Sequence, residues 1–144
     1  MKAMRIVAVI FAVYVGLGLS LDAAIGFFQP EMGSTVVLRS FDTDGNSQDT
    51  VLSLLDDDGQ LWVESGHWFR GWYHSVVANP DIELVRDGQP SPYRAVPLDT
   101  KAALETVTRL MGKGQGVGYY VGRTMLLWAP IHPVRLDPRR PGSS

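Results

Sequence analysis

Hydrophobic and polar positions divide the chain into a long apolar segment at the N-terminus and a remainder of short, alternating stretches. Residues 6–21 carry no charge, and after Asp22 the apolar character resumes up to Phe28. A helix of about 20 apolar residues is long enough to cross a bilayer. A domain this small could hardly cover a buried helix that is apolar on all sides. We therefore expect residues 1–28 to form a single transmembrane anchor.

A signal segment is the alternative interpretation of the same residues. A basic start with Lys2 and Arg5, followed by an apolar run, is typical of both. Residues 21–23 make a poor cleavage site, which favours an uncleaved, single-pass anchor in contact with membrane lipid. Basic residues before the segment and acidic residues after it favour a domain outside the cytoplasm. We expect a linker at residues 29–34.

The remainder, residues 35–137, has the alternation and the polar turns of short strands. These features predict strands at Thr35–Phe41, Asp49–Leu55, Gln60–Glu64, Asp81–Arg86, Tyr93–Leu98 and Ile131–Leu136. The tight connections between the first strands predict an antiparallel meander.

Helical periodicity predicts one short helix that begins near Gly71 and ends before Pro80, and a longer helix from Thr100 to Met111. We expect Gly112–Gly118 to be a flexible glycine connection and residues 138–144 to be a disordered tail. The segment Tyr119–Trp128 fits helix or strand. The predicted fold class is α+β: a split β-barrel of five or six antiparallel strands with flanking helices, preceded by one transmembrane helix.

Charge and composition exclude several functions. The net charge of −2 lacks the basic excess of nucleic-acid-binding domains. The absence of cysteine removes disulfides, thiolate nucleophiles and thiolate metal sites. The three histidines match no metal-binding spacing, and the oxygen-rich turn at residues 42–47 departs from a calcium loop, so we expect no metal.

The junction between residues 61 and 80 carries the candidate chemistry. A strand ends at Ser65 and Gly66, and a helix follows at once with Arg70, Gly71 and Trp72. Backbone N–H groups at a helix start favour anions, and aromatic faces favour flat rings. The sequence therefore predicts that this junction binds a planar, anionic ligand.

The segment WVESGHWFRGWYHSVVANPDIELVRDG resembles the family of deazaflavin-dependent nitroreductases and quinone reductases, as do the later YRAVPL and PVRL. The resemblance covers most of residues 35–137. It implies a flavin-binding split β-barrel in which a reduced deazaflavin coenzyme (8-hydroxy-5-deazaflavin), or alternatively FMN, passes a hydride to a quinone or nitro compound. It also implies that the domain could pair as a homodimer.

Carried over onto this chain, the resemblance implies two groups of cofactor-binding residues. The backbone of Ser65, Gly66 and His67 would face the ring. The helix start would lie beside the polar tail, through Arg70, Gly71 and Trp72.

One departure from the family concerns the hairpin between the first two strands. The family has a basic, glycine-containing hairpin there, whereas this chain has DTDGNSQDT. Anionic tails would meet like charge, although Gln48 and Thr50 could still donate hydrogen bonds. Two hypotheses follow: a membrane-anchored oxidoreductase of quinones or nitro compounds, or a non-catalytic split barrel that binds a small hydrophobic ligand.

Overall fold

The computed structural model describes residues 2–28, 35–66 and 71–139, so the predicted linker at residues 29–34 lies outside the described residues. The elements in chain order are α1 (Lys2–Phe28), β1 (Thr35–Phe41), β2 (Ser47–Ser53), β3 (Leu55–Asp57), β4 (Gln60–Ser65), α2 (Gly71–Ala78), β5 (Asp81–Arg86), β6 (Gln89–Pro97), α3 (Lys101–Gln115), α4 (Val117–Met125) and β7 (His132–Pro138).

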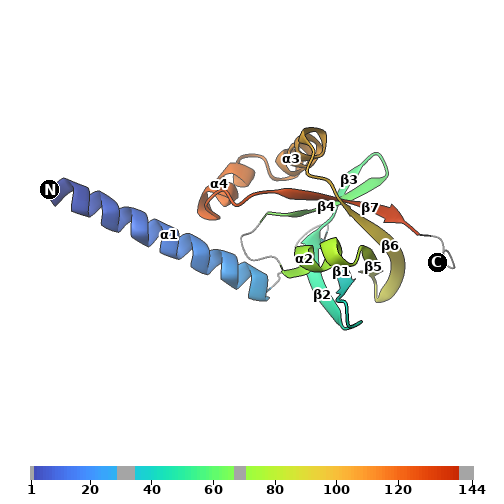
Figure 1. Ribbon diagram of the computed structural model, residues 1–144. Helices are drawn as coiled ribbons and strands as arrows, with labels where there is room; N and C mark the ends of the chain where they lie inside the picture. Colours follow the sequence, from blue (N-terminus) through green and yellow to red (C-terminus); the bar gives the residue numbers. More distant parts are fainter. Residues whose placement is uncertain (1, 29–34, 67–70, 140–144) are drawn as a thin grey trace.

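Within this part of the chain, seven strands form one antiparallel sheet in the order β2-β1-β5-β6-β7-β4-β3. The sheet curls into a half-barrel, which brings the edge strand β2 close to β4 (Figure 1). The predicted α+β fold with a split barrel is confirmed. The predicted meander is wrong. Consecutive strands form three hairpins, but β2 and β3 lie at opposite edges of the sheet although only Leu54 separates them in sequence. The hairpins are connected through the β1–β5, β6–β7 and β4–β7 ladders.

Two hairpins close through two-residue turns that the sequence marks with Asp-Gly. Asp58 and Gly59 both have positive φ (52° and 93°), and so do Asp87 and Gly88 (50° and 73°). Positive φ at both central positions defines the turn whose twist matches that of the flanking strands. These turns fix the register of β3 on β4 and of β5 on β6.

The inner face of the curled sheet buries one apolar cluster. Strand β1 alternates between buried and half-buried residues along its whole length, as expected of a strand with one face in the core. Helix α2 closes this cluster from the open side, with Trp72 and Val76 only 2% and 0% exposed. The other cluster members from the strands are Val36, Leu38, Leu52, Val63, Ile82, Leu84, Ala95, Val134 and Leu136.

A smaller cluster lies between α3 and the opposite face of the sheet. Trp62 on β4 packs there against Ala103 and Val107 of the helix. The helix begins as predicted, since the Thr100 hydroxyl accepts a hydrogen bond of 3.2 Å from the Ala103 N–H. In Figure 1, α3 and α4 lie on the other side of the sheet from α2.

The predicted flexible connection at Gly112–Gly118 is wrong. Helix α3 continues to Gln115, and only Gly116 leaves the helical conformation, with φ 54° and ψ −130°. Its N–H bonds to the Gly112 carbonyl at 2.9 Å and ends the helix. The segment Tyr119–Trp128, which fitted helix or strand, is helical up to Met125 as part of α4, because its apolar positions follow a helical period.

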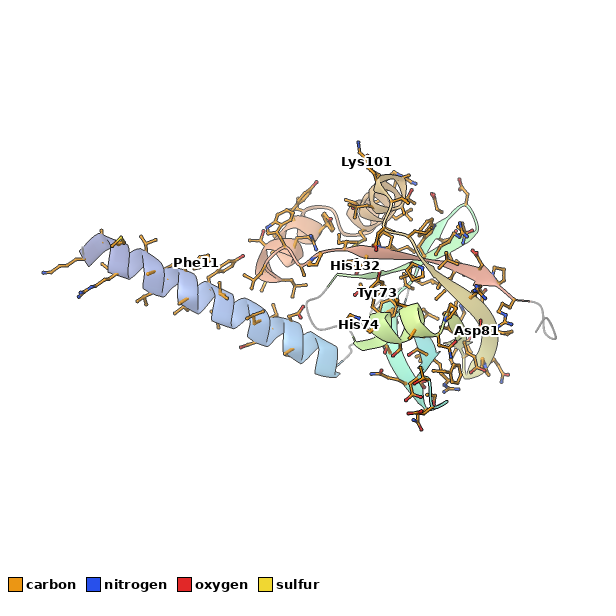
Figure 2. All side chains as sticks on the ribbon, viewed as in Figure 1. Phe11, Tyr73, His74, Asp81, Lys101 and His132 are labelled. Carbon is orange, nitrogen blue, oxygen red and sulfur yellow. The ribbon has the colours of Figure 1, made fainter. Side chains whose placement is uncertain are left out.

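Helix α1 projects from the domain as a long rod (Figure 1). Its segment Lys2–Ala24 is long and apolar enough to cross a membrane, a property that signal sequences share. A core helix would be mostly buried, whereas Val9, Phe11 and Leu17 are 62%, 65% and 67% exposed, and Phe11 projects from the free part of the rod (Figure 2).

We predict that Leu38→Ala lowers the free energy of unfolding by about 2–5 kcal/mol, because it leaves a cavity in the cluster inside the half-barrel. Thermal or urea unfolding of the full chain in detergent micelles measures this. The control is Val77→Ala on α2. The Val77 side chain is 57% exposed, so this substitution should change the free energy of unfolding by less than about 0.5 kcal/mol. Equal losses in the two variants would contradict the core assignment.

Candidate functional site

The junction between β4 and α2 is built on a buried strand end. Ser65 is 1% exposed and pairs with His132, the first residue of β7. Gly66 follows and is also buried. His67 and Arg70, which the resemblance placed in the site, lie outside the described residues. Ser65 is therefore held in place by the β4–β7 ladder, and Gly66 follows directly after this strand end.

Gly66 is required by a close approach. A Cβ atom at this position would overlap the carboxylate of Glu64, which lies against the glycine from two residues earlier. Any side chain here would have to displace that carboxylate. The Glu64 carboxyl group thus lies beside the backbone that the sequence predicted to face a ligand.

Helix α2 begins at Gly71, which is exposed, and continues with Trp72, which is almost fully buried. The Trp72 ring packs in the core cluster, edge-on to Tyr73 with ring centroids 6.1 Å apart. Its indole N–H is buried without a hydrogen-bond partner in the part of the chain that the structure describes. A buried donor without an acceptor is costly, so a ligand acceptor at this junction would stabilise the site.

Three residues that sequence reasoning did not select gather beside this helix start. The Tyr73 and His132 rings stack at 4.9 Å with an angle of 30°, as Figure 2 shows for the labelled pair. His132 Nδ1 lies 3.2 Å from Asp99 Oδ1. Burial, with a smaller contribution from the charge of Asp99, raises the pKa of the Tyr73 phenol. The phenol therefore stays protonated at neutral pH and can donate a hydrogen bond.

Only the register of the sheet could have revealed that Tyr73, His132 and Asp99 lie together. His132 is far from Tyr73 in sequence, and only the Ser65–His132 register pair brings β7 to the end of β4. A pocket of about 310 Å³ adjoins the group. It is lined by Asp99, Thr100, Lys101, Leu104, Ile131, His132 and Pro133. The volume is at the lower end of the range for small-molecule sites, about 300–1,000 Å³.

Gln48 and Thr50 lie on β2, at the edge of the sheet that curls towards β4. Thr50 faces the core opposite Leu38 and is 5% exposed. Gln48 is exposed, and its carbonyl accepts a hydrogen bond of 3.4 Å from the Ser40 hydroxyl. Strand β2 thus places a buried hydroxyl and an exposed amide on one strand face, two residues apart.

The acidic hairpin is organised by its own carboxylates. Asp42 accepts hydrogen bonds from the Asp44 N–H at 2.9 Å, the Asn46 N–H at 2.8 Å and the Asn46 side-chain amide at 3.0 Å. The Asn46 side chain is the largest cause of the lowered pKa of Asp42, followed by the backbone N–H of the same residue. The carboxylate is therefore charged at neutral pH. Within the described residues, no group of three or more potential metal ligands gathers here or elsewhere.

Asp49 is neutralised across the hairpin by Arg39. The guanidinium binds both carboxylate oxygens, at 2.7 and 2.9 Å, and this hydrogen bonding lowers the pKa of Asp49. Arg39 also reaches Glu83 on β5 at 3.5 Å. The cation next to the hairpin is therefore engaged by two carboxylates and is a poor partner for a ligand phosphate.

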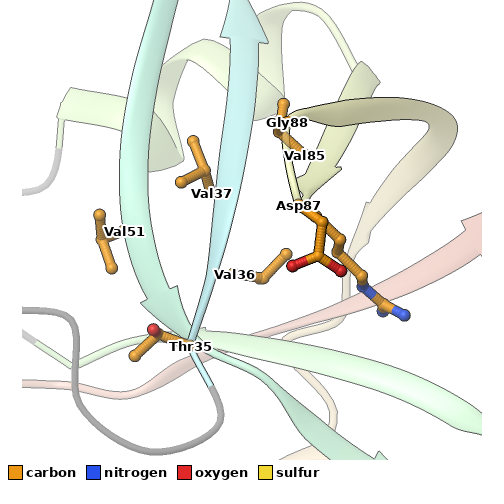
Figure 3. Close-up of a pocket in the computed structure, with 8 residues that line it drawn as sticks. Thr35, Val36, Val37, Val51, Val85, Asp87 and Gly88 are labelled. Carbon is orange, nitrogen blue, oxygen red and sulfur yellow. The ribbon is translucent and has the colours of Figure 1, made fainter.

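A second pocket, of about 520 Å³, lies at the other end of β1 (Figure 3). Val37 is in register with both Val51 and Val85, so an aliphatic row crosses three strands here. Its full lining is Thr35, Val36, Val37, Val51, Val85, Arg86, Asp87 and Gly88. None of the predicted site residues lines this pocket, whose walls combine the aliphatic row with the polar side chains of Thr35, Arg86 and Asp87.

We predict that the hairpin makes stability sensitive to acid. Hydrogen bonds in the folded state lower the pKa of Asp42 from about 3.8. The charged carboxylate therefore stabilises the fold above the unfolded-state pKa, and this stabilisation is lost as the pH falls through the lower folded-state pKa. Urea unfolding from neutral pH to about pH 2 should therefore show a smaller acid loss in Asp42→Asn, which keeps the turn. Asp44→Asn is the control for charge, and an equal change there would contradict the role of Asp42.

No protein-family model matches the sequence, and no curated protein matches it. Among solved structures, the chain is similar to an F420-H2 dependent reductase, with 17% identity, 70% of this chain and 93% of the other covered, and a TM-score of 0.52. A putative pyridoxamine 5'-phosphate oxidase from Listeria innocua has 15% identity, coverage of 85% and 94%, and a TM-score of 0.53. The haem storage protein HutZ from Vibrio cholerae has 15% identity, coverage of 74% and 82%, and a TM-score of 0.52.

These likenesses concern the fold, because identities this low do not transfer a site or an activity. They cover 70–85% of this chain and 82–94% of each neighbour. The chain has the split β-barrel fold that these proteins share.

Proposed function

We propose that this chain is a membrane-anchored oxidoreductase that holds a reduced deazaflavin, or alternatively FMN, at the β4–α2 junction and reduces quinones or nitro compounds. The observation that carries the proposal is the buried Trp72 N–H, which has no acceptor among the described residues. It lies one residue into the helix that follows Ser65 and Gly66. A carbonyl or ring nitrogen of a flat ligand would supply that acceptor.

The described residues fit the ring of such a cofactor better than its anionic tail. The Trp72 N–H offers a donor, and the stacked Tyr73 and His132 rings offer an aromatic surface beside it. The hairpin of β1 and β2 offers the charged carboxylates of Asp42 and Asp49 instead of cations. We propose that an anionic tail lies away from this hairpin and pairs with Arg70, as the resemblance implies, or that the cofactor has a shorter tail.

When bound, the cofactor supplies the hydride, and the chain supplies position and protons. Reduction of a quinone also needs hydrogen bonds to the carbonyl oxygen on which negative charge develops. The Tyr73 phenol is protonated at neutral pH, and the His132–Asp99 pair holds the stacked imidazole in place. We assign Tyr73 as the donor to the acceptor oxygen and His132 as the residue that orients it.

The anchor α1 would keep the domain beside lipid-soluble acceptors. Lys2 and Arg5 precede the apolar segment, and this charge pattern favours a domain outside the cytoplasm. Pairing of two copies through their sheets is part of the proposal, by analogy with the fold.

A second candidate is a non-catalytic split barrel that binds a small hydrophobic ligand. The acidic hairpin favours it, because both carboxylates are charged and the neighbouring Arg39 is already engaged. The pocket lined by Val37, Val51 and Val85 would be the place for that ligand. Fluorescence titration of the full chain in micelles with deazaflavin and FMN separates the two: the oxidoreductase requires micromolar or tighter binding of one of them.

We predict that Trp72→Phe weakens cofactor binding by about three- to tenfold, because one hydrogen bond contributes about 0.5–1.5 kcal/mol. Trp62→Phe is the matched control. It removes another buried indole N–H without a described partner, from the cluster under α3. Isothermal titration at equal folded fractions measures both affinities. Equal weakening by the two substitutions would contradict the placement of the ring at Trp72.

We also predict that Asp44→Lys strengthens binding of the deazaflavin severalfold at low salt, since it reverses one charge of the acidic hairpin. The gain should shrink as salt is raised to about 1 M, where the Debye length is about 3 Å. Riboflavin, which has no phosphate, should show no gain. Glu105→Lys on exposed α3 is the control for net charge, and the same gain there would contradict a local repulsion between the hairpin and the tail.

A further inference from the structure

Helix α4 presents an apolar face that the domain does not cover. Its opposite side packs inward through Tyr119, which is 6% exposed. The exposed residues follow a helical spacing and continue into the turn after the helix. They form what we call the α4 stripe: Val117, Tyr120, Val121, Met125 and Trp128, with exposures of 79%, 61%, 52%, 50% and 54%.

The charge on α4 suits a lipid interface. Within Val117–Met125 the only charged residue is Arg123. Its guanidinium donates a hydrogen bond to the Ala129 carbonyl and lies 5.4 Å from the centre of the Trp128 ring. The stripe thus carries no carboxylate, and it has a tyrosine and a tryptophan, the residues enriched where membrane meets water.

The position of α4 along the anchor is fixed by direct contacts. The Tyr14 hydroxyl donates a hydrogen bond to the Thr124 carbonyl. One turn further on, Gly18 lets the Leu127 side chain and the Met125 carbonyl come so close that a Cβ atom would overlap them. One more turn on, Asp22 is 1% exposed. The face of α1 marked by residues 14, 18 and 22 is therefore covered by the domain, as Figure 1 shows for α4.

These contacts conflict with a domain that stays wholly in water. A helix rises about 1.5 Å per residue, so Tyr14 lies about 15 Å before Ala24, the end of the apolar span. The hydrocarbon core is about 30 Å thick. If the bilayer ended before Tyr14, residues 2–13 would supply only about 18 Å of helix. Too little apolar length would remain to cross, so the contact between α1 and α4 must lie inside the membrane boundary.

We infer that α4 and the turn to Trp128 insert into the lipid leaflet on the domain side, with the α4 stripe against the acyl chains. The inference rests on the anchor of the proposed function and adds a second membrane contact to it. An apolar pocket of about 190 Å³ between the two helices, lined by Tyr14, Leu17, Gly18, Leu21 and Met125, opens towards the same lipid.

Insertion of α4 gives the candidate site a direct route from the bilayer. His132 begins β7 only four residues after Trp128. The Tyr73–His132 pair would then lie close above the lipid surface. A quinone dissolved in the bilayer would need to rise by a short distance, without passing through bulk water.

The absence of cysteine makes the test direct, because each engineered thiol is unique. Val121→Cys and Met125→Cys report on the α4 stripe, and Val9→Cys reports on the anchor. The controls are Val77→Cys on α2 and Leu104→Cys on α3, which are 57% and 41% exposed in the domain. Each full-length variant carries an environment-sensitive fluorophore in phosphatidylcholine vesicles, with nitroxide lipids or aqueous iodide as quencher.

The inference expects severalfold stronger quenching by nitroxide lipid at residues 121 and 125 than at residues 77 and 104, and the reverse order with iodide. Lipid quenching at residue 9 with iodide quenching at residue 121 would overturn the insertion of α4 and leave the anchor intact. Water access at residue 9 would overturn the anchor itself. Disulfide-linked dimers of unlabelled Val121→Cys, with no lipid quenching of the labelled variant, would assign the stripe to a second copy of the chain and overturn the inference.

Discussion

The burial of Trp72 and Val76 inside the curl of the sheet is the interaction on which the candidate site depends. Helix α2 has only eight residues, and helices this short are not stable alone in water. The core cluster holds α2, and α2 in turn sets where the chain leaves β4 at Ser65 and Gly66. The indole of Trp72 also leaves its N–H without an acceptor in the described residues, so the same side chain packs the core and carries the proposed contact with the cofactor.

Short-range signals predicted the fold well, and long-range pairings explain the misses. Strands 35–41 and 81–86 follow from alternation bounded by turn residues, and both have the predicted bounds. The seven-strand order could not be predicted, because the β1–β5 and β4–β7 ladders join residues that only the curl brings together. The prediction that the helix ends at Gly112 was wrong for another reason. Packing of α3 on the sheet outweighs the roughly 1 kcal/mol cost of a glycine within a helix.

The candidate site was predictable only where it is continuous in sequence. Ser65, Gly66 and Trp72 form one such segment, and the structure places all three at a buried junction. Tyr73, His132 and Asp99 were missed because their association depends on the β4–β7 register. The acidic hairpin was visible as a departure from the family pattern. Its internal hydrogen bonds explain how it tolerates so much charge: Asp42 stabilises the turn, and Asp49 pairs with Arg39.

The turn after α4 has a further consequence for how rod and barrel are joined. Leu127 and Trp128 both hold left-handed backbone angles, with φ of 55° and 51°, a conformation that costs non-glycine residues roughly 1–2 kcal/mol each. A glycine at position 127 would relieve that strain but would also remove the side chain that fills the notch at Gly18. The orientation of the domain relative to α1 thus depends on Leu127, whose side chain a strained backbone holds in the notch at Gly18. A substitution at this one position would change that orientation without altering either helix.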